Sequence, residues 1–232
     1  MNPVAPQLPA ERVLEIVSEN RVPRDRYPVC VVAIRGYRLD SLGKPGANDR
    51  DVFDDALFIV TPDRIIPFNG NTDPAGWKNG RATLVPGIHI FGIGPHNVSK
   101  GPSRMYPAYR QCEPFTVTRD GRGNTRFSGY FGIDLHKAHG WFGSFGRVDS
   151  LGCQTVPTES GPLGWTTFKP TLDALLVQHG NEPAWNDLGL WAIADGADAA
   201  TVKKVHSFPY ILIEETERRK GNLIVSRRYF KD

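Results

Sequence analysis

Short runs of apolar and β-branched residues alternate along the chain with polar stretches rich in glycine, proline, asparagine and aspartate. Runs of this length, bounded by turn residues, are typical of buried β-strands. They predict strands at residues 29–35, 56–61, 64–69, 83–91, 114–119, 127–135 and 208–214. The turn dipeptide Asp120-Gly121 joins two of these runs and predicts a β-hairpin. The pattern therefore predicts a mainly β protein.

Apolar residues recur at helical spacing in two segments. Residues 9–20 place three apolar side chains on one face, and residues 164–179 carry a stripe of aromatic and leucine side chains that ends at Gly180, a typical C-cap. We also expect a short helix that begins at Asp198, and a loop at residues 105–111. The pattern predicts an N-terminal helix and one or two helices in the C-terminal half.

Glycine and proline are abundant, with 24 Gly and 19 Pro among the 232 residues. Because these residues cost about 1 and 3 kcal/mol in a helix interior, a helical bundle is excluded. The length and the ordinary apolar content favour one domain with a single core. Within residues 1–232 we expect an N-terminal helical segment (1–25), a core (27–180) that holds a catalytic motif at 130–157, and a C-terminal extension (181–232) that completes the sheet.

The charge of the chain excludes one class of partner. The formal net charge is only +3, which is too small to define a phosphate-binding surface. Basic residues gather at 218–220, 227, 228 and 231, and this cluster is interpreted as a solvated face, with weak attraction to an anionic polymer as the alternative. No basic stripe interleaved with aromatic residues accompanies it, so we expect no nucleic-acid partner.

Two further features bear on the compartment. The first twenty residues carry three glutamates and no apolar segment, so we expect no signal peptide. No run of 18 apolar residues occurs, so we expect no membrane span and no stable membrane association. Three widely spaced cysteines, Cys30, Cys112 and Cys153, form no disulfide framework. We therefore expect a cytoplasmic protein in the cell that makes it, with at least one free thiol.

Reactive side chains are densest between residues 129 and 157. His136 ends a predicted strand, and Cys153 follows it by 17 positions. An imidazole near a thiol can take its proton and stabilise the thiolate. Gly152 lets a substrate carbonyl approach backbone N–H groups that can form an oxyanion hole. The same residues also allow a structural interpretation, in which the cysteine is a small buried hydrophobe and the histidine a satisfied polar residue.

The order of His136 and the tetrapeptide Ser-Leu-Gly-Cys at 150–153 resembles the motif of the L,D-transpeptidase (YkuD-type) catalytic domain. In that family a histidine at a strand end precedes Ser/Thr-His-Gly-Cys. Residues 83–90 resemble the upstream strand of the family, residues 130–136 resemble its approach to the histidine, and the layout is similar to a group of bacteriophage proteins. The resemblance implies an L,D-transpeptidase-like β-sandwich with an N-terminal helix and one or two helices after the cysteine.

The resemblance also implies a role for each residue of the motif. Cys153 is the nucleophile, and His136 is its base, with the imidazole oriented by the backbone carbonyl of Lys137. Ser150 supports the turn that carries the cysteine. The amides of Gly152 and Cys153 lie near the oxyanion.

Substrate contacts are expected from Lys137, Thr155 and Tyr130. Two positions depart from the family pattern: Leu151 stands where the family has a second histidine, and Thr155 stands where it has Asn or Arg. Both changes remove polar groups beside the nucleophile, so we expect the acyl group to pass to water rather than to an amine.

The function that the resemblance implies is a peptidoglycan-degrading cysteine peptidase of the phage endolysin kind. It would cleave stem peptides or cross-links through a thioester on Cys153, as a monomer without metal or cofactor, and act on the wall peptidoglycan after release. Three alternatives stay open: an L,D-transpeptidase that forms cross-links, a zinc-dependent peptidoglycan hydrolase, and a non-catalytic wall-binding or virion protein. Ligand types for zinc are available at His89, His96, Asp134, His136, His139 and Cys153.

Overall fold

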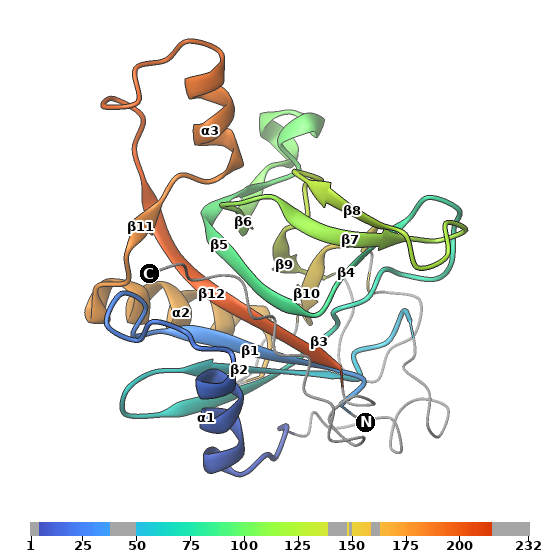
Figure 1. Cartoon of the computed structure of the whole chain (residues 1–232), viewed down its shortest axis with the longest axis vertical. Coiled ribbons are helices and arrows are strands. Elements are labelled where there is room, and N and C mark those ends of the chain that lie inside the picture. The colour runs from blue at the N-terminus through green and yellow to red at the C-terminus, as the bar shows by residue number, and fades with distance from the viewer. Residues whose placement is uncertain (1–4, 38–49, 139–147, 149, 159–162, 215–232) are drawn as a thin grey trace.

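The computed structural model describes residues 5–37, 50–138, 148, 150–158 and 163–214. Within these ranges the chain is mainly β, as the apolar pattern predicts, and three α-helices accompany two sheets (Figure 1). The helices are α1 (Ala10–Glu19), α2 (Trp165–His179) and α3 (Asp187–Ala194). None of the helices in these ranges is long and apolar enough to cross a membrane.

Nine of the described strands form one mixed sheet. They follow the order β10 (Gln154–Val156), β9 (Leu135–Lys137), β6 (Tyr106–Gln111), β5 (Gly87–His96), β12 (Val205–Glu214), β1 (Cys30–Arg35), β2 (Asp55–Val60) and β3 (Ile65–Gly70), with β11 (Pro183–Ala184) paired to β12. The two ends of this order meet, because Asn71 after β3 exchanges backbone hydrogen bonds of 2.9 and 2.8 Å with Thr155 in β10. The sheet is therefore nearly closed into a barrel.

A second, smaller sheet consists of β4 (Ala82–Leu84), β7 (Phe115–Arg119) and β8 (Arg126–Gly129). Strands β7 and β8 form the hairpin that Asp120-Gly121 predicts. The apolar run at residues 83–91 is not one strand, because it divides at Pro86 and Gly87. Its first part joins the small sheet as β4, and its second part joins the main sheet as β5. The proline and glycine that interrupt the run thus mark the passage of the chain between the two sheets.

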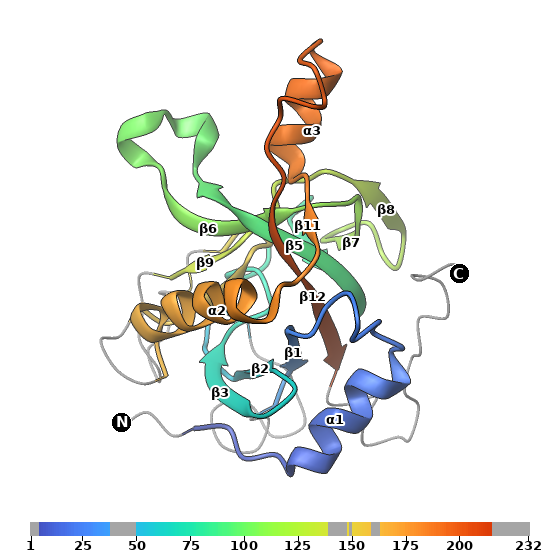
Figure 2. The same cartoon turned by 90° about the vertical axis from the view of Figure 1, so that its left-hand side faces the viewer.

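Strand β1 is buried on both faces, which explains its uninterrupted apolar sequence. Val31 and Ala33 belong to the core cluster that includes the apolar side chains of α2, whereas Val32 and Ile34 belong to the cluster that includes α1. Figure 2 shows these two helices on opposite sides of the central strands. Both helices lie where their apolar spacing predicts, and α2 ends at Gly180 in the left-handed conformation.

Three predictions of local structure are wrong. The run at residues 127–135 is not one strand, because residues 127–129 belong to β8 in the small sheet and residue 135 begins β9 in the main sheet. Residues 105–111 are not a loop, since most of them form β6, which pairs with β5 from His96 opposite Tyr106 to Phe91 opposite Gln111. The pairing joins consecutive strands, but the composition of residues 105–111 does not indicate it. The additional helix is α3 rather than a helix that begins at Asp198, and its N-cap at residue 186 is an asparagine whose side chain accepts a hydrogen bond.

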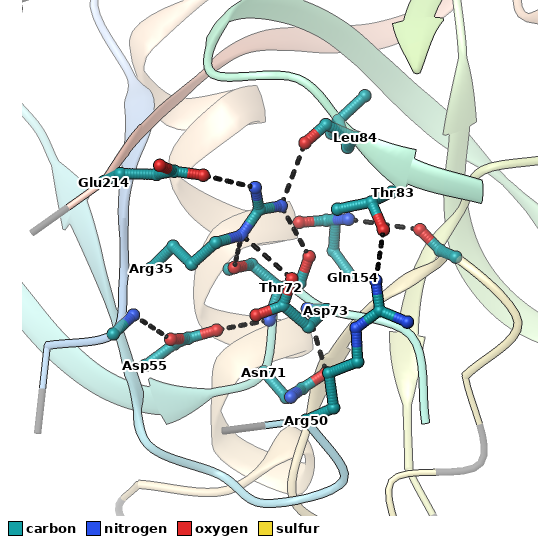
Figure 3. A network of polar contacts seen from close by, with 12 residues as sticks. Arg35, Arg50, Asp55, Asn71, Thr72, Asp73, Thr83, Leu84, Gln154 and Glu214 are labelled. Atoms are coloured by element: carbon teal, nitrogen blue, oxygen red, sulfur yellow. Dashed lines mark hydrogen bonds and ion pairs between the residues drawn. The ribbon is translucent and has the colours of Figure 1, made fainter. Parts of the chain in front are cut away.

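A buried polar network joins the ends of the central strands (Figure 3). The Arg35 guanidinium, at the end of β1, donates to the carbonyl oxygens of Thr72 and Leu84, each at 2.9 Å. It also pairs with Asp73 at 3.2 Å and with Glu214 at 3.1 Å. The Arg35 side chain is only 4% exposed, so solvent does not screen these contacts. One cation therefore ties together β1, β4, β12 and the segment after β3.

Replacing Arg35 by Ala is expected to lower the free energy of unfolding by about 3–5 kcal/mol, because buried carboxylates are left without their cation. Urea denaturation measures this loss. The matched control is Arg26→Ala, which removes an ion pair with Glu182 whose side chains are 51% and 42% exposed, and which should cost about 1 kcal/mol or less. Equal urea midpoints for the two variants would contradict the prediction.

Candidate active site

Four neighbouring strands bring the reactive side chains together. Cys153 directly precedes β10, and β10 runs parallel to β9 with Thr155 opposite His136. Strand β9 pairs with β6, and β6 pairs with β5 so that Tyr106 lies opposite His96. His96, His136 and Cys153 are far apart in the sequence, yet each offers one nitrogen or sulfur atom, and these atoms lie within 4.8 Å of one another.

A turn stabilised by Ser150 presents the cysteine. The Ser150 hydroxyl accepts a hydrogen bond from the Gly152 N–H at 3.0 Å and donates one to the Cys153 carbonyl at 2.6 Å. Gly152 has a φ of 144°, and a Cβ at this position would lie 2.8 Å from the carbonyl oxygen of Ala82. The backbone angle and the close approach both require glycine here. The Gln154 side chain adds a hydrogen bond of 3.3 Å to the Gly152 carbonyl.

The donors to an oxyanion differ from those that the resemblance implies. The Gly152 N–H already donates to Ser150, so it does not serve a substrate oxygen. Among the described residues, none accepts a hydrogen bond from the Cys153 N–H. The Cys153 amide is therefore the candidate oxyanion donor of this turn.

The Cys153 thiol lines a pocket and is nearly buried. Burial and, to a smaller extent, the negative charge of Asp134 raise the pKa of this thiol to about 12, against the opposing effects of the Asp134 N–H and of the positive charges on Arg110 and Lys100. The sulfur lies 3.5 Å from the Gly132 carbonyl oxygen and 3.4 Å from the Asp134 nitrogen. The resting thiol is therefore protonated, and a reaction in which it acted as a nucleophile would need a base to take its proton.

The tautomer of His136 suits it to be that base. Its Nδ1 lies 2.6 Å from the Lys137 carbonyl oxygen and 3.1 Å from the Tyr106 hydroxyl. Because a carbonyl oxygen can only accept, Nδ1 carries the proton, and Nε2 is the basic nitrogen of the neutral ring. The Lys137 carbonyl thus lies where the resemblance expects the group that orients the imidazole.

A second imidazole, His96, stacks on the first. The two ring centroids are 4.0 Å apart, and the ring planes differ by 20°. The Nδ1 atom of His96 lies 2.7 Å from an oxygen of Asp134. Asp134 in turn lies 3.5 Å from Arg110, which makes two bonds of 2.6 Å to the Asp187 carboxylate. Burial raises the pKa of Asp134, although the hydrogen bond from His96 and the charge of Arg110 oppose this effect.

The sequence indicated His96 only as one of several zinc ligands and did not reveal its pairing with Asp134. One signal in the sequence points to His96. The apolar residues of the predicted strand continue beyond residue 91 to Ile93, three positions before this histidine. An extension of the strand prediction to this point would have placed a second histidine at a strand end. The contact between the two imidazoles still depends on the pairing of β5, β6 and β9, which no local pattern specifies.

The pocket beside Cys153 is positively charged. It has a volume of about 480 Å³, and both imidazoles line it. Four basic residues, Lys78, Arg81, Lys100 and Arg119, also line it. No acidic side chain among the described residues does so. An excess of positive charge in a concave site favours anionic ligands.

A second pocket, of about 500 Å³, adjoins the first and shares His96, Asn97, Phe131 and Gly132 with it. Tyr130 lines this second pocket together with Trp191 of α3. Tyr130, an expected substrate contact, therefore lines the adjoining pocket and not the pocket that Cys153 lines.

The remaining predicted residues lie elsewhere. The Thr155 side chain is fully buried in β10 and lines neither pocket, and the Lys137 ammonium lies 4.9 Å from the centre of the Tyr106 ring. His89 is buried away from the thiol, with its Nε2 bonded to the Val85 carbonyl. His139 lies outside the described residues.

No protein-family model, curated protein or solved structure matches the chain. The chemistry that the site can perform therefore follows from the positions of its own side chains. These combine a thiol, two imidazoles with defined hydrogen bonds, and a cationic pocket.

Alkylation of Cys153 by iodoacetamide is expected to speed up about tenfold per pH unit from pH 7 to pH 10, because a thiol with a pKa of about 12 ionises only slightly over this range. Mass spectrometry of the peptide that carries Cys153 measures the rate. Free N-acetylcysteine in the same reaction is the control, and its rate should level off above a pKa of about 8.5. A plateau for the protein below pH 8 would instead indicate a thiolate–imidazolium pair at rest.

Proposed function

We propose that the protein is a peptidoglycan-degrading cysteine peptidase with an L,D-transpeptidase-like catalytic core, of the kind that phages use as endolysins. The observation that carries this proposal is the pair formed by Cys153 and His136. The thiol precedes a strand that is in register with the strand of the imidazole, and the Lys137 carbonyl sets the tautomer that a base requires. The motif and its spacing supply the peptidoglycan part of the proposal.

The first half of the reaction follows from these contacts. The Cys153 proton passes to His136 Nε2 while the sulfur attacks the peptide carbonyl carbon. The Cys153 N–H stabilises the oxyanion, the carbon–nitrogen bond breaks, and the amine leaves with the proton that His136 received. The product is a thioester on the cysteine.

The charge and shape of the pocket support a peptide substrate with free carboxylates, such as a stem peptide. Lys78, Arg81, Lys100 and Arg119 surround the approach to the thiol. Leu151, which also lines this pocket, has an exposed apolar side chain. A chain that carries carboxylates and aliphatic side chains matches this lining.

Transfer of the acyl group to water is favoured over transfer to an amine. Leu151 is 72% exposed beside the thiol and provides no polar group. Thr155 is buried and cannot reach an acceptor in the pocket. An amine would need donors and acceptors that hold it in line for attack, whereas water needs only a base. Cross-link formation by an L,D-transpeptidase remains the alternative outcome.

A zinc hydrolase is the second candidate, because His96, His136 and Cys153 are ligand types that catalytic zinc sites use and lie within 4.8 Å. The stacked rings disfavour it. Two imidazoles on one tetrahedral zinc, with bonds of about 2.0–2.1 Å, would place their ring centroids roughly 5 Å apart. The observed separation is 4.0 Å, so the rings would have to move apart to share an ion.

Cys153→Ala is expected to abolish the release of soluble fragments from purified sacculi, because the acyl group then has no nucleophile to which it can be transferred. Mass spectrometry of the products identifies new carboxyl ends, and Cys112→Ala is the matched control that should keep the wild-type rate. A wild-type rate for Cys153→Ala would contradict the proposal. A wild-type protein that binds sacculi but releases no soluble fragments would instead favour a non-catalytic wall-binding protein.

Dialysis against EDTA is expected to leave sacculus digestion unchanged, whereas iodoacetamide should stop it, because the attacking group is the thiol rather than a metal-bound water. Digestion rates before and after each treatment measure the effect. Complete loss after EDTA with recovery on added zinc would support the zinc hydrolase instead.

A further inference from the structure

Attack by the thiol requires one base, and the site contains two imidazoles that could accept a proton, His136 and His96. His136 is nearly buried, and its Nδ1 is committed to the Lys137 carbonyl. The His96 side chain is 18% exposed and lines both adjoining pockets. The two imidazoles near the thiol differ in their access to solvent, so they are suited to different steps of a reaction.

The hydrogen bonds of His96 make it a base in its own right. A carboxylate only accepts hydrogen bonds, so the 2.7 Å contact with Asp134 places the His96 proton on Nδ1 and leaves Nε2 as the basic nitrogen. A proton gained at Nε2 creates an imidazolium beside a carboxylate whose side chain is 3% exposed. Asp134 therefore fixes the tautomer and the orientation of His96, as a carboxylate does for the base of a catalytic triad.

Arg110 holds this carboxylate in place. The guanidinium bonds Asp187 through two nitrogens and donates from Nη1 to the Pro95 carbonyl at 2.7 Å, one residue before His96. The same Nη1 lies 3.5 Å from Asp134. The pair of Asp134 and His96 is thus fixed by the sheet and by the first turn of α3.

We propose that His96, oriented by Asp134, is the catalytic base of the second half-reaction and activates the water that hydrolyses the thioester. This inference rests on the proposed cysteine peptidase function. One proton of the water passes to His96 Nε2 as the water oxygen bonds to the acyl carbon. The carbon–sulfur bond then breaks, the acid product leaves, and the sulfur takes the proton from His96. Each histidine therefore serves one half of the cycle and ends it neutral.

Positions in the pockets support this division. The amine that leaves in the first half takes the proton of His136, which restores that ring before water enters. Water reaches the thioester through the open pockets, where His96 is the more exposed of the two imidazoles. One ring nitrogen of His96 lies within 4.8 Å of the sulfur, a separation across which one water molecule can relay the proton.

The test separates the two halves of the reaction with soluble stem-peptide fragments prepared from sacculi. His96→Gln is expected to release the first amine at a rate within about threefold of wild type, while steady-state turnover falls about 100-fold or more, a typical loss for a missing base. The intact mass of the variant should show an acyl adduct on Cys153. Asp134→Asn keeps a hydrogen-bond acceptor for His96 without the charge, and should give the same split with a smaller loss of turnover.

The matched control is His179→Gln, because the His179 side chain is 17% exposed and lies outside both pockets. It should show wild-type turnover and no adduct. Equal losses of amine release and turnover in His96→Gln and Asp134→Asn would overturn the inference, as would wild-type turnover in both. Fragment cleavage that continues in Cys153→Ala, with no adduct in any variant, would instead refute the cysteine peptidase itself.

Discussion

The three-residue strand β10 is the constraint on which the site depends. It is hydrogen-bonded along both edges, to β9 on one side and to Asn71 on the other. These bonds nearly close the main sheet, and they also fix the register that sets Thr155 opposite His136. Because Cys153 is the residue before β10, the same short strand both nearly closes the sheet and positions the thiol.

Burial determines the proton chemistry of this site. The thiol, His136 and Asp134 are all nearly buried, so each charge that forms there has to be matched by a neighbour rather than by water. The raised pKa of Cys153 is the cost of this arrangement. In return, the nearly buried His136 imidazole and Asp134 carboxylate lie in a medium of low dielectric constant, where their contacts with the Lys137 carbonyl and with His96 are stronger than they would be in water.

Local patterns predicted the parts of the fold that local interactions decide. The apolar runs gave β1, β2 and β12, the helical spacing gave α1 and α2, and the motif brought Ser150, Gly152 and Cys153 into one turn. The sheet order, strand β6 and the contact of His96 with His136 arise from pairing between distant segments, which single-sequence patterns do not encode. Thr155 shows the same limit, because its neighbourhood in the sequence suggested a substrate contact while the barrel closure buries it.

Adjacent positions in the cysteine turn differ sharply in what they tolerate. Gly152 faces the Ala82 carbonyl and has a backbone angle that other residues rarely adopt, so its identity is tied to the fold. Leu151 is 72% exposed and lines the pocket, so it has little packing to lose. A library that varies residue 151 and keeps residue 152 would change what enters the pocket while the barrel stays intact. The lining of the pocket can therefore be altered one residue away from a position that the backbone requires to be glycine.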